Sequence, residues 1–358
     1  MVVEALDLFC GIGGLTHGVK NAGIKVVAGI DIDATCKYAY TENNKVPFIG
    51  KSIEDVTASE IKKYFSKNAF KILMGCAPCQ PFSRYTYRYN KKGYKDDKWK
   101  LLYEFQRLVE ETNPDIVSME NVPKISKEKV FDDFIKKLKN LKYHVYWKII
   151  NCAQYGTPQN RIRLVLLASK HGIISLNEPF NNENTYCTVR DAISHLEPIE
   201  NGEVSKTDSM HRASRLSKIN LQRIKQSIPG GNWTDWDETL ILNCHKKKTG
   251  KTYKSIYGRM EWDKPSPTIT TQFYGYGNGR FGHPEQNRAI TLREGAILQS
   301  FPTDYKFFDN NHKLPTRIIG THIGNAVPVK LGKVIGESIL NHLKGFGGEK
   351  IEKKKKTG

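Results

Sequence analysis

The residues best suited to do chemistry lie in the segment GCAPCQPFS, residues 75–83. Within it, Cys79 stands between Pro78 and Pro81, whose rings restrict the backbone on both sides of the thiol. The thiolate is the reactive form of cysteine, and a free thiol, with a pKa of about 8.5, is only slightly ionised at neutral pH. A cysteine held in a loop of defined shape is typical of a nucleophile, and we predict that role for Cys79.

The same segment contains a C-x-x-C pair, Cys76 and Cys79, which could form a redox pair or half of a zinc site. The remaining cysteines form no second pair, and the Cys244–His245 dipeptide stands alone. We therefore expect no metal. Seven cysteines at irregular spacing also argue against a disulfide framework and favour a reducing compartment.

A glycine-rich turn follows the first apolar run, in the segment DLFCGIGGLTHG. Gly11, Gly13 and Gly14 allow a sharp turn and the close approach of a ligand. The dinucleotide pattern G-x-G-x-x-G fails because Thr16 stands at its third glycine, which argues against a nicotinamide oxidoreductase. Asp31 follows about 20 residues later, where a carboxylate can accept hydrogen bonds from both hydroxyls of a ribose. The pattern predicts a nucleoside pocket without a diphosphate cradle, and S-adenosylmethionine fits that description.

Strands that alternate with helices must position these residues. This alternation predicts the α/β class, with a doubly wound, mainly parallel sheet. Ligands bind such sheets at the carboxyl edge, where Asp31, Cys79 and Glu120 each end or follow an apolar run. The expected strands cover residues 2–9, 24–33, 69–76, 114–122, 143–152 and 161–170, and the expected helices cover residues 33–44, 99–112, 131–141, 291–301 and 325–343.

The alternation stops near residue 185, and the chain up to residue 290 is polar and rich in Gly, Asn, Thr and Trp. We expect residues 185–290 to form a smaller, inserted domain of irregular β-structure that recognises the target. The expected remainder is a catalytic and cofactor-binding domain over 1–184 completed by 319–345, a hinge over 291–318, and a disordered basic tail over 346–358.

The charge of the chain indicates the kind of partner. Its 358 residues include 56 Lys and Arg against 37 Asp and Glu, which gives a formal net charge of +19. An excess of this size is typical of proteins that bind a polyanion, most simply a nucleic acid. No apolar run approaches the ~20 residues of a membrane span, and the N-terminus lacks the basic region of a signal peptide. We therefore expect a cytoplasmic protein without membrane contact.

Six motifs together resemble those of the cytosine-5 DNA methyltransferases of bacterial restriction–modification systems. DLFCGIGGL resembles their cofactor loop, PCQPFS their nucleophile loop, and ENV at 120–122 their glutamate motif. QNRIRL at 159–164, REGAILQSFP at 293–302 and GNAVP at 324–328 resemble three further motifs. They occur in the order of the family and cover most of the chain, apart from the variable middle region.

The resemblance implies the reaction of the family. A methyl group passes from S-adenosylmethionine to carbon 5 of a cytosine flipped out of duplex DNA, and S-adenosylhomocysteine is left. Cys79 is then the nucleophile that forms a covalent adduct with the base, while Glu120, Arg161 and Arg163 lie beside it. The chemistry agrees, because thiolate addition at carbon 6 makes carbon 5 electron-rich. A carboxyl at ring nitrogen 3 can share a proton, and the planar fork of Arg163 suits the carbonyl oxygen of the base.

The resemblance also implies a set of cofactor contacts. Where the family commonly has an Asp that contacts the adenine amine, this chain has Ser52, with Glu54 or Asp55 as alternatives through a register shift. We expect Cys76 to pack beside the cofactor pocket. The other positions that match cofactor contacts are Phe9, Gly11, Gly13, Asp31, Ile32, Ile53, Pro78, Leu101, Asn325 and Val327.

Two regions are expected to contact DNA. The basic run after Cys79 should close over the duplex as a lid, through Gln80, Ser83, Arg84, Arg88, Lys91 and Lys92. In the middle region, Arg259, Gln272 and Arg280 are candidates for contacts with phosphates and base edges. We expect a monomer that acts on double-stranded DNA at the nucleoid of a prokaryote, with any cognate restriction endonuclease acting separately.

Two alternatives stay open. A transfer-RNA cytosine-5 methyltransferase would carry similar motifs, although the long basic middle region favours the reading of a DNA sequence. A catalytically idle DNA-binding relative is opposed by the intact set of Cys79, Glu120 and Arg163.

Overall fold

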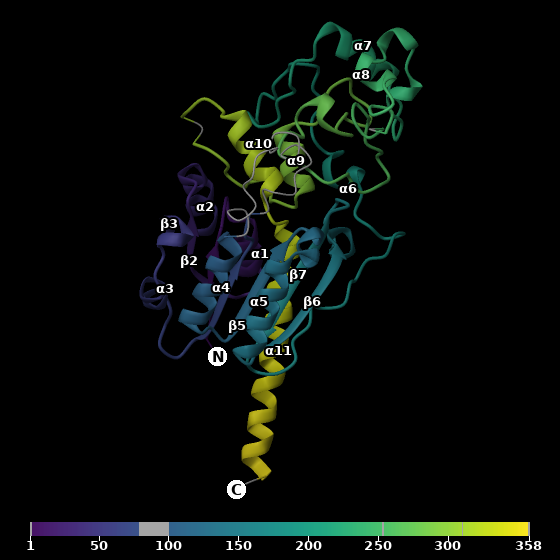
Figure 1. The fold of residues 1–358 in the computed structure, drawn as a ribbon. Coiled ribbons are helices and arrows are strands. Elements are labelled where there is room, and N and C mark those ends of the chain that lie inside the picture. Colours follow the sequence, from purple (N-terminus) through teal and green to yellow (C-terminus); the bar gives the residue numbers. More distant parts are fainter. Residues whose placement is uncertain (1, 79–99, 253, 310, 357–358) are drawn as a thin grey trace. The chain divides into compact units, whose positions relative to one another are not determined.

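The computed structural model describes residues 2–78, 100–252, 254–309 and 311–356 of the chain (Figure 1). The chain forms two compact units. The first comprises residues 1–151, 162–179 and 327–358, and the second comprises residues 152–161 and 180–326.

This division differs from the expected one, because the loop 152–161 and the whole of 291–326 belong to the second unit. The cause lies in packing. Helix α9 (Leu292–Leu298) contacts both α6 (Val189–Ile193) and α10 (Thr316–Asn325). The segment expected to act as a hinge is therefore part of the core of the second unit.

The first unit contains a seven-stranded sheet in the order β3-β2-β1-β4-β5-β7-β6. β7 runs antiparallel to both of its neighbours, β5 and β6, and the other adjacent pairs are parallel. The mainly parallel, doubly wound α/β fold is thus confirmed, with one reversed strand. The strands are β1 (Val3–Leu8), β2 (Lys25–Asp31), β3 (Phe48–Gly50), β4 (Phe70–Gly75), β5 (Ile116–Asn121), β6 (His144–Asn151) and β7 (Ile162–Ser169), of which only the three-residue β3 was not predicted.

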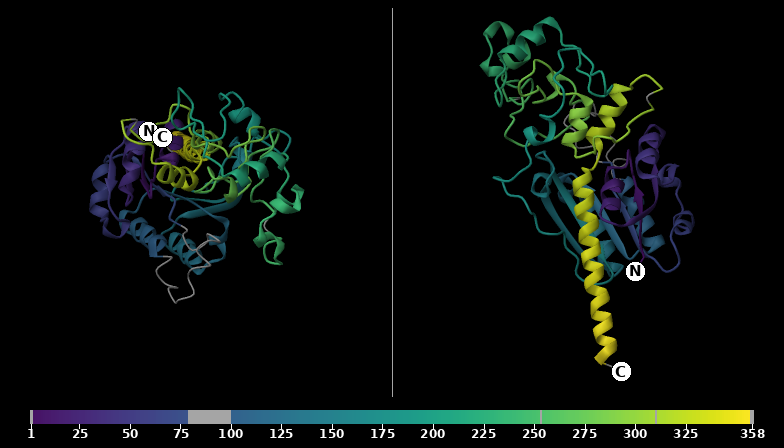
Figure 2. Two further views of the ribbon diagram at one scale, coloured as in Figure 1. Left: turned by 90° about the horizontal axis from the view of Figure 1, so that it is seen from above. Right: turned by 180° about the vertical axis from the view of Figure 1, so that it is seen from behind.

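Helices cover both faces of this sheet. On one face, α3 (Ala58–Tyr64), α4 (Lys100–Thr112) and α5 (Lys129–Asn140) pack through Ile61, Phe105 and Phe134 onto the strands. On the other face lie α1 (Gly14–Asn21), α2 (Lys37–Asn44) and α11 (Val329–Lys356), and Figure 2 shows α11 from behind, running across the sheet. α11 continues to Lys356, although a disordered tail was expected from residue 346.

The second unit contains no ladder of strands among its described residues, where irregular β-structure was expected. Its helices are α6, α7 (Lys218–Gln226), α8 (Asn243–Lys246), α9 and α10, and isolated β-bridges join neighbouring segments. Trp233, Trp236 and Tyr276 form an aromatic core around Ile224. Short 3-10 turns complete both units: Ala34–Cys36, Ile53–Asp55, Pro123–Lys127, Cys152–Tyr155, Trp233–Asp235, Glu238–Leu240 and Tyr276–Asn278.

No helix in the described ranges has both the length and the apolar character that a membrane span requires.

The two helices α1 and α11 approach each other closely enough for their backbones to touch. A Cβ at Gly18 of α1 would lie 2.2 Å from the carbonyl oxygen of Val329 and 2.6 Å from the nitrogen of Lys333. A Cβ at Gly332 of α11 would lie 2.9 Å from the carbonyl oxygen of Leu15. These glycines allow α11 to pack directly against α1 on the same face of the sheet.

We predict that Gly18→Ala lowers the free energy of unfolding by on the order of 1–3 kcal/mol, because the added methyl group overpacks a backbone contact. Gly345→Ala is the control, since a Cβ there meets no atom within 4 Å. On the same helix α11 it should stabilise by up to about 1 kcal/mol, the difference in helix propensity. Urea unfolding measures both, and equal stability of Gly18→Ala and the wild type would contradict the packing described.

Candidate active site

The register of the sheet brings four loops to one edge. Leu8 at the end of β1 is aligned with Ile30 of β2 and with Gly75 of β4, and Gly75 is aligned with Met119 of β5. After β1 the chain adds β2 and β3 on one side of it, and from β4 it adds strands on the other side. The order of strands therefore reverses between the adjacent strands β1 and β4, and doubly wound sheets bind ligands at the carboxyl edge of this switch point. The residues that follow in each strand or loop are Phe9, Asp31, Cys76 and Glu120.

The glycine turn after β1 has the backbone shape that its sequence indicates. Phe9, Gly11 and Gly13 have φ angles of +59°, +50° and +87°, in the left-handed region. The Gly11 N–H donates to Asp31 Oδ2 at 2.8 Å, and the Asp33 N–H donates to Asp31 Oδ1 at 2.9 Å. Asp31 therefore ties the turn to the end of β2.

The residues around this turn fit an S-adenosyl nucleoside. A Cβ at Gly11 would meet no atom within 4 Å, which leaves space above the turn. Ile32 is 73% exposed, so an apolar surface is open beside Asp31. Each Asp31 oxygen accepts one backbone N–H and keeps capacity for a further donor, such as a ribose hydroxyl.

The other expected cofactor residues of the first unit differ in exposure. Ile53 is 4% exposed and lies in the core, while Phe9 and Leu101 are half-buried against that core. Pro78 is exposed, and Val327 is 6% exposed. Asn325 is the exposed last residue of α10 in the second unit.

Ser52 caps a 3-10 turn, because its hydroxyl accepts the Glu54 N–H at 3.4 Å. Glu54 pairs with Lys100 at 3.2 Å, and Asp55 is exposed. The adenine contact stays a prediction for Ser52, with the two acids as its alternatives.

Glu120 is a buried carboxylate, 2% exposed, at the end of β5. The Cys76 thiol donates to its Oε2 at 2.8 Å. Arg163 Nε lies 2.9 Å from its Oε1 as an ion pair, yet Oε1 accepts no hydrogen bond from the described residues. The Glu120 carboxyl group is thus held by Cys76 at Oε2 and by the Arg163 ion pair at Oε1.

Cys76 therefore has a role that the sequence did not indicate. Instead of only packing, its thiol orients Glu120. The alignment of Gly75 with Met119 explains the contact, because it places the next residue of each strand side by side.

Asp7 is a second residue that the sequence did not single out. It is 1% exposed beneath the glycine turn, and Thr16 Oγ1 donates to its Oδ2 at 2.6 Å. Burial raises the pKa of Asp7 to about 7. Because it lies within the apolar run of β1, it was expected only as a strand residue.

The two arginines of the QNRIRL motif have different surroundings. Arg163 pairs with Glu120, and its expected place beside the base stays a prediction. Arg161 is 3% exposed, and its Nη1 and Nη2 donate to backbone oxygens of Ile269, Gly324 and Ala326 within the second unit. These contacts argue against the expected base contact of Arg161.

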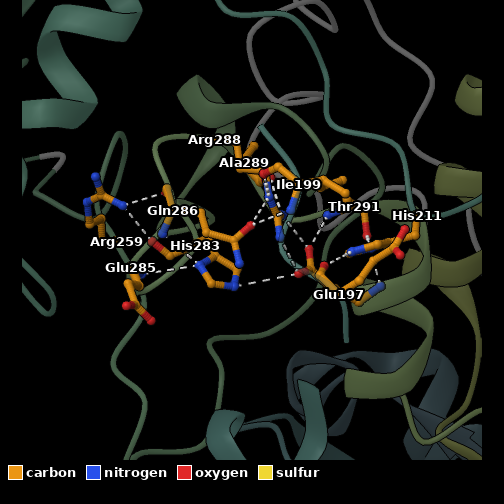
Figure 3. Close-up of polar contacts among 11 residues, drawn as sticks. Glu197, Ile199, His211, Arg259, His283, Glu285, Gln286, Arg288, Ala289 and Thr291 are labelled. Atoms are coloured by element: carbon orange, nitrogen blue, oxygen red, sulfur yellow. Dashed lines mark hydrogen bonds and ion pairs between the residues drawn. The ribbon is translucent and has the colours of Figure 1, made fainter. Parts of the chain in front are cut away.

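Arg259 is corrected from a reader of DNA to a structural residue. It is 4% exposed, and burial lowers its pKa. All five of its N–H donors are used by oxygens of Ser227, His283, Gln286, Ile224 and Asn287, some of which Figure 3 shows. No donor is left for a base or a phosphate.

The two other candidates of the second unit are more accessible. Gln272 is exposed, and its backbone oxygen accepts from the Gly275 N–H and from the side-chain amide of Asn278. Arg280 is half-buried, and its Nη1 donates to the Gly231 carbonyl at 2.6 Å. Several predictions lie outside the described residues, namely those for Cys79, Gln80, Ser83, Arg84, Arg88, Lys91 and Lys92.

A buried polar network stabilises the second unit (Figure 3). Arg288 and Glu294, each 1% exposed, form two bonds of 2.8 Å. Burial alone would raise the pKa of Glu294, but the charge and hydrogen bonds of Arg288 hold it at about 2. His283 Nδ1 accepts the backbone N–H groups of Glu285 and Gln286, and burial lowers the pKa of His283 to about 4.

This network predicts how stability depends on pH. The folded-state pKa of His283 lies below its ordinary value of 6.5, so the unfolded chain takes up the proton first as the pH falls. The contribution of the neutral His283 to the free energy of unfolding is complete above pH 6.5. It declines by about 2 kcal/mol between pH 6.5 and pH 4.5. Glu294, whose pKa is depressed from 4.5 to about 2, loses its contribution only below pH 4.5.

His283→Asn keeps an acceptor near Nδ1 and removes the titrating group. Compared with the wild type, this variant should show a flatter loss of stability between pH 6.5 and 4.5 in urea unfolding followed by tryptophan fluorescence. Parallel curves for the two proteins would contradict the assignment of a buried, neutral His283.

The doubly wound sheet, the glycine turn at its switch point and the buried carboxylate beside it form the candidate site. Two solved structures share the fold. A prophage-encoded protein from Escherichia coli has a TM-score of 0.68 at 22% identity and covers 96% of this chain and 99% of that chain. Spodoptera frugiperda DNMT2 has a TM-score of 0.65 at 18% identity over 94% of this chain and 99% of that chain.

Sequence comparison gives the family. The model of the C-5 cytosine-specific DNA methylases matches residues 3–341. The type II methylase M.HgiDII of Herpetosiphon aurantiacus is 53% identical over 97% of both chains. The type II methyltransferase M1.HphI of Haemophilus parahaemolyticus is 30% identical over 95% of this chain and 87% of the relative. The chain therefore belongs to the C-5 cytosine-specific DNA methylase family and is a DNA (cytosine-5-)-methyltransferase.

Proposed function

We propose that this methyltransferase is the protective methylase of a type II restriction–modification system. It would transfer a methyl group from S-adenosylmethionine to carbon 5 of a flipped-out cytosine in one duplex sequence. The 53% identity to a type II methylase supports the biological role. The observation that carries the chemistry is Glu120, a buried carboxyl group that Arg163 and Cys76 hold in the same row as the glycine turn.

Cys79 begins the reaction in this proposal. The electron pair of its thiolate forms a bond to carbon 6 of the cytosine, and the ring electrons move toward nitrogen 3 and the carbonyl oxygen. Glu120, in its protonated form, gives its proton to nitrogen 3 and takes it back when the ring double bond re-forms, and the guanidinium of Arg163 stabilises the charge that develops. Carbon 5 is then nucleophilic.

S-adenosylmethionine, when bound, supplies the methyl group that carbon 5 takes. The proton on carbon 5 then leaves to a base, its bond electrons re-form the ring double bond, and the carbon–sulfur bond breaks. Cys79 returns as a thiolate, and the net products are 5-methylcytosine, S-adenosylhomocysteine and a proton.

The chain's own residues would hold the cofactor at the switch point. Asp31 would accept the ribose hydroxyls, Ile32 would cover a face of the adenine, and Gly11 would leave room for the nucleoside. In the second unit, Gln272 and Arg280 keep polar groups accessible to DNA. Arg280 is the stronger candidate for a guanine edge, because its planar fork can donate twice.

We predict that Glu120→Gln lowers the methylation rate by on the order of 10²–10⁴-fold, because an amide cannot shuttle the proton. Its affinities for DNA and cofactor should stay close to those of the wild type. Glu110→Gln, on the exposed side of α4, is the matched control and should be fully active. A loss below tenfold for Glu120→Gln would assign Glu120 to structure alone.

Cys79→Ser should abolish methylation and retain DNA binding, since a serine alkoxide does not form at neutral pH. Cys76→Ser should stay active, because a hydroxyl can replace the thiol that donates to Glu120. Bisulfite sequencing of DNA from cells that express each protein reports both the activity and the methylated sequence. Turnover by Cys79→Ser, or methyl transfer to transfer RNA in preference to DNA, would overturn the proposal.

A further inference from the structure

Four lysines stand in one tight turn of the second unit, at the end of α8. We call residues 246–251 the lysine turn, and its basic residues are Lys246, Lys247, Lys248 and Lys251. All four lysines are exposed, and the sequence contains no acidic residue between Glu238 and Glu261. The turn therefore concentrates positive charge within six residues.

The positive charge of the lysine turn is not neutralised by the residues that the structure describes. None of its four lysines forms an ion pair with them, whereas Lys264 of the same unit pairs with Glu261 at 2.7 Å. The acids of the preceding turns have other partners, because Asp235 Oδ2 accepts a backbone N–H at 2.7 Å and Asp237 Oδ2 accepts from a side-chain amide at 2.5 Å. Like charges repel one another, so this arrangement favours the binding of a polyanion.

Backbone contacts hold the lysine turn in one shape. The N–H groups of Gly250 and Lys251 donate to the Lys247 carbonyl oxygen at 2.9 and 3.2 Å. A Cβ at Gly250 would lie 1.8 Å from the carbonyl oxygen of Cys244, so the turn packs directly on the backbone of α8. The lysines therefore extend from a closed turn.

His245 joins the lysine turn to the aromatic core of the second unit. Its side chain is buried, and its ring stacks on Trp233 with the ring centroids 4.5 Å apart and the planes inclined by 18°. Tyr257 contacts the same ring edge-on, at a centroid distance of 6.4 Å. His245 Nδ1 donates to the Gly250 carbonyl oxygen at 3.4 Å. One buried ring thus connects the core to the turn.

We propose that the lysine turn binds the phosphate backbone of duplex DNA and that His245 is its positioning residue. Lysine ammonium groups bind phosphates as point charges, and phosphate contacts carry no sequence information. A turn that is ordered before binding loses less conformational entropy on binding. The inference rests on the proposed action on duplex DNA and deepens it, because it identifies a surface that adds affinity without reading the sequence.

The dependence of DNA affinity on salt tests these phosphate contacts. The test variant carries Lys246→Gln, Lys247→Gln and Lys248→Gln. The control carries Lys62→Gln, Lys63→Gln and Lys67→Gln, which are exposed residues of the first unit. Fluorescence anisotropy with a labelled duplex gives the Kd from about 50 to about 200 mM NaCl. In the test variant, the slope of log affinity against log salt should decrease by about 0.9 for each lost contact, or about 2.7 in all.

The control should keep the slope of the wild type, although its net charge changes by the same amount. A decrease of less than about 0.9 in the test variant, or an equal decrease in the control, would overturn the inference. Bisulfite sequencing should find the same methylated sequence for the test variant and the wild type, and a changed sequence would contradict the assignment to phosphates. Wild-type protein that binds no duplex DNA would instead refute the proposed function.

His245→Ala separates positioning from charge. It removes the stack on Trp233 and keeps every lysine, so at fixed salt the Kd for DNA should rise about fivefold while the slope stays that of the wild type. His245→Phe keeps an aromatic ring and should restore the affinity, since a hydrogen bond of 3.4 Å is weak. If His245→Ala does not fold, Gly250→Ala, whose Cβ displaces the turn from α8, is measured in the same way. An unchanged Kd in the folded variant, or no restoration by His245→Phe, would overturn the positioning role of His245.

Discussion

The burial of the Glu120 carboxylate is the constraint on which the candidate site depends. A carboxyl group that is 2% exposed is costly to bury unless partners stabilise it by hydrogen bonds or an ion pair. Arg163 and Cys76 supply these partners. Arg163 can do so because β7 runs antiparallel to β5, which brings the first residues of β7 to the carboxyl edge of the sheet. A parallel β7 would place its last residues there, and the motif QNRIRL would lie at the opposite edge.

The same edge explains why residues far apart in sequence act together. The alignment of β2, β1, β4 and β5 sets Asp31, the glycine turn, Cys76 and Glu120 in one row. The order of the row matches the reaction proposed, because the cofactor residues lie at one end and the base residues at the other. Backbone hydrogen bonds fix the order, so the site needs few dedicated side-chain contacts to assemble.

Much of this row could be predicted from sequence, because strand ends can be recognised from apolar runs that stop at a polar residue. Asp31 and Glu120 were placed at the edge in this way. The exposure of an arginine could not be predicted: Arg161 and Arg259 are buried and bind mainly backbone oxygens, whereas Arg280 is half-buried. Asp7 and the thiol of Cys76 were missed because their partners come from other strands and helices.

The central claim is that a thiolate adds to the base while Glu120 shares its proton. The most direct measurement uses a duplex with 5-fluorocytosine at the methylated position, since fluorine cannot leave carbon 5 as a proton does. With S-adenosylmethionine present, the protein should stay covalently bound through denaturing electrophoresis, and without it no stable adduct should accumulate. Cys76 and Cys79 share one tryptic peptide between Lys71 and Arg84, so tandem mass spectrometry must locate the bond. The account predicts the adduct on Cys79. An adduct on Cys76 or another cysteine, or methylation of ordinary DNA without any trapping, would contradict it.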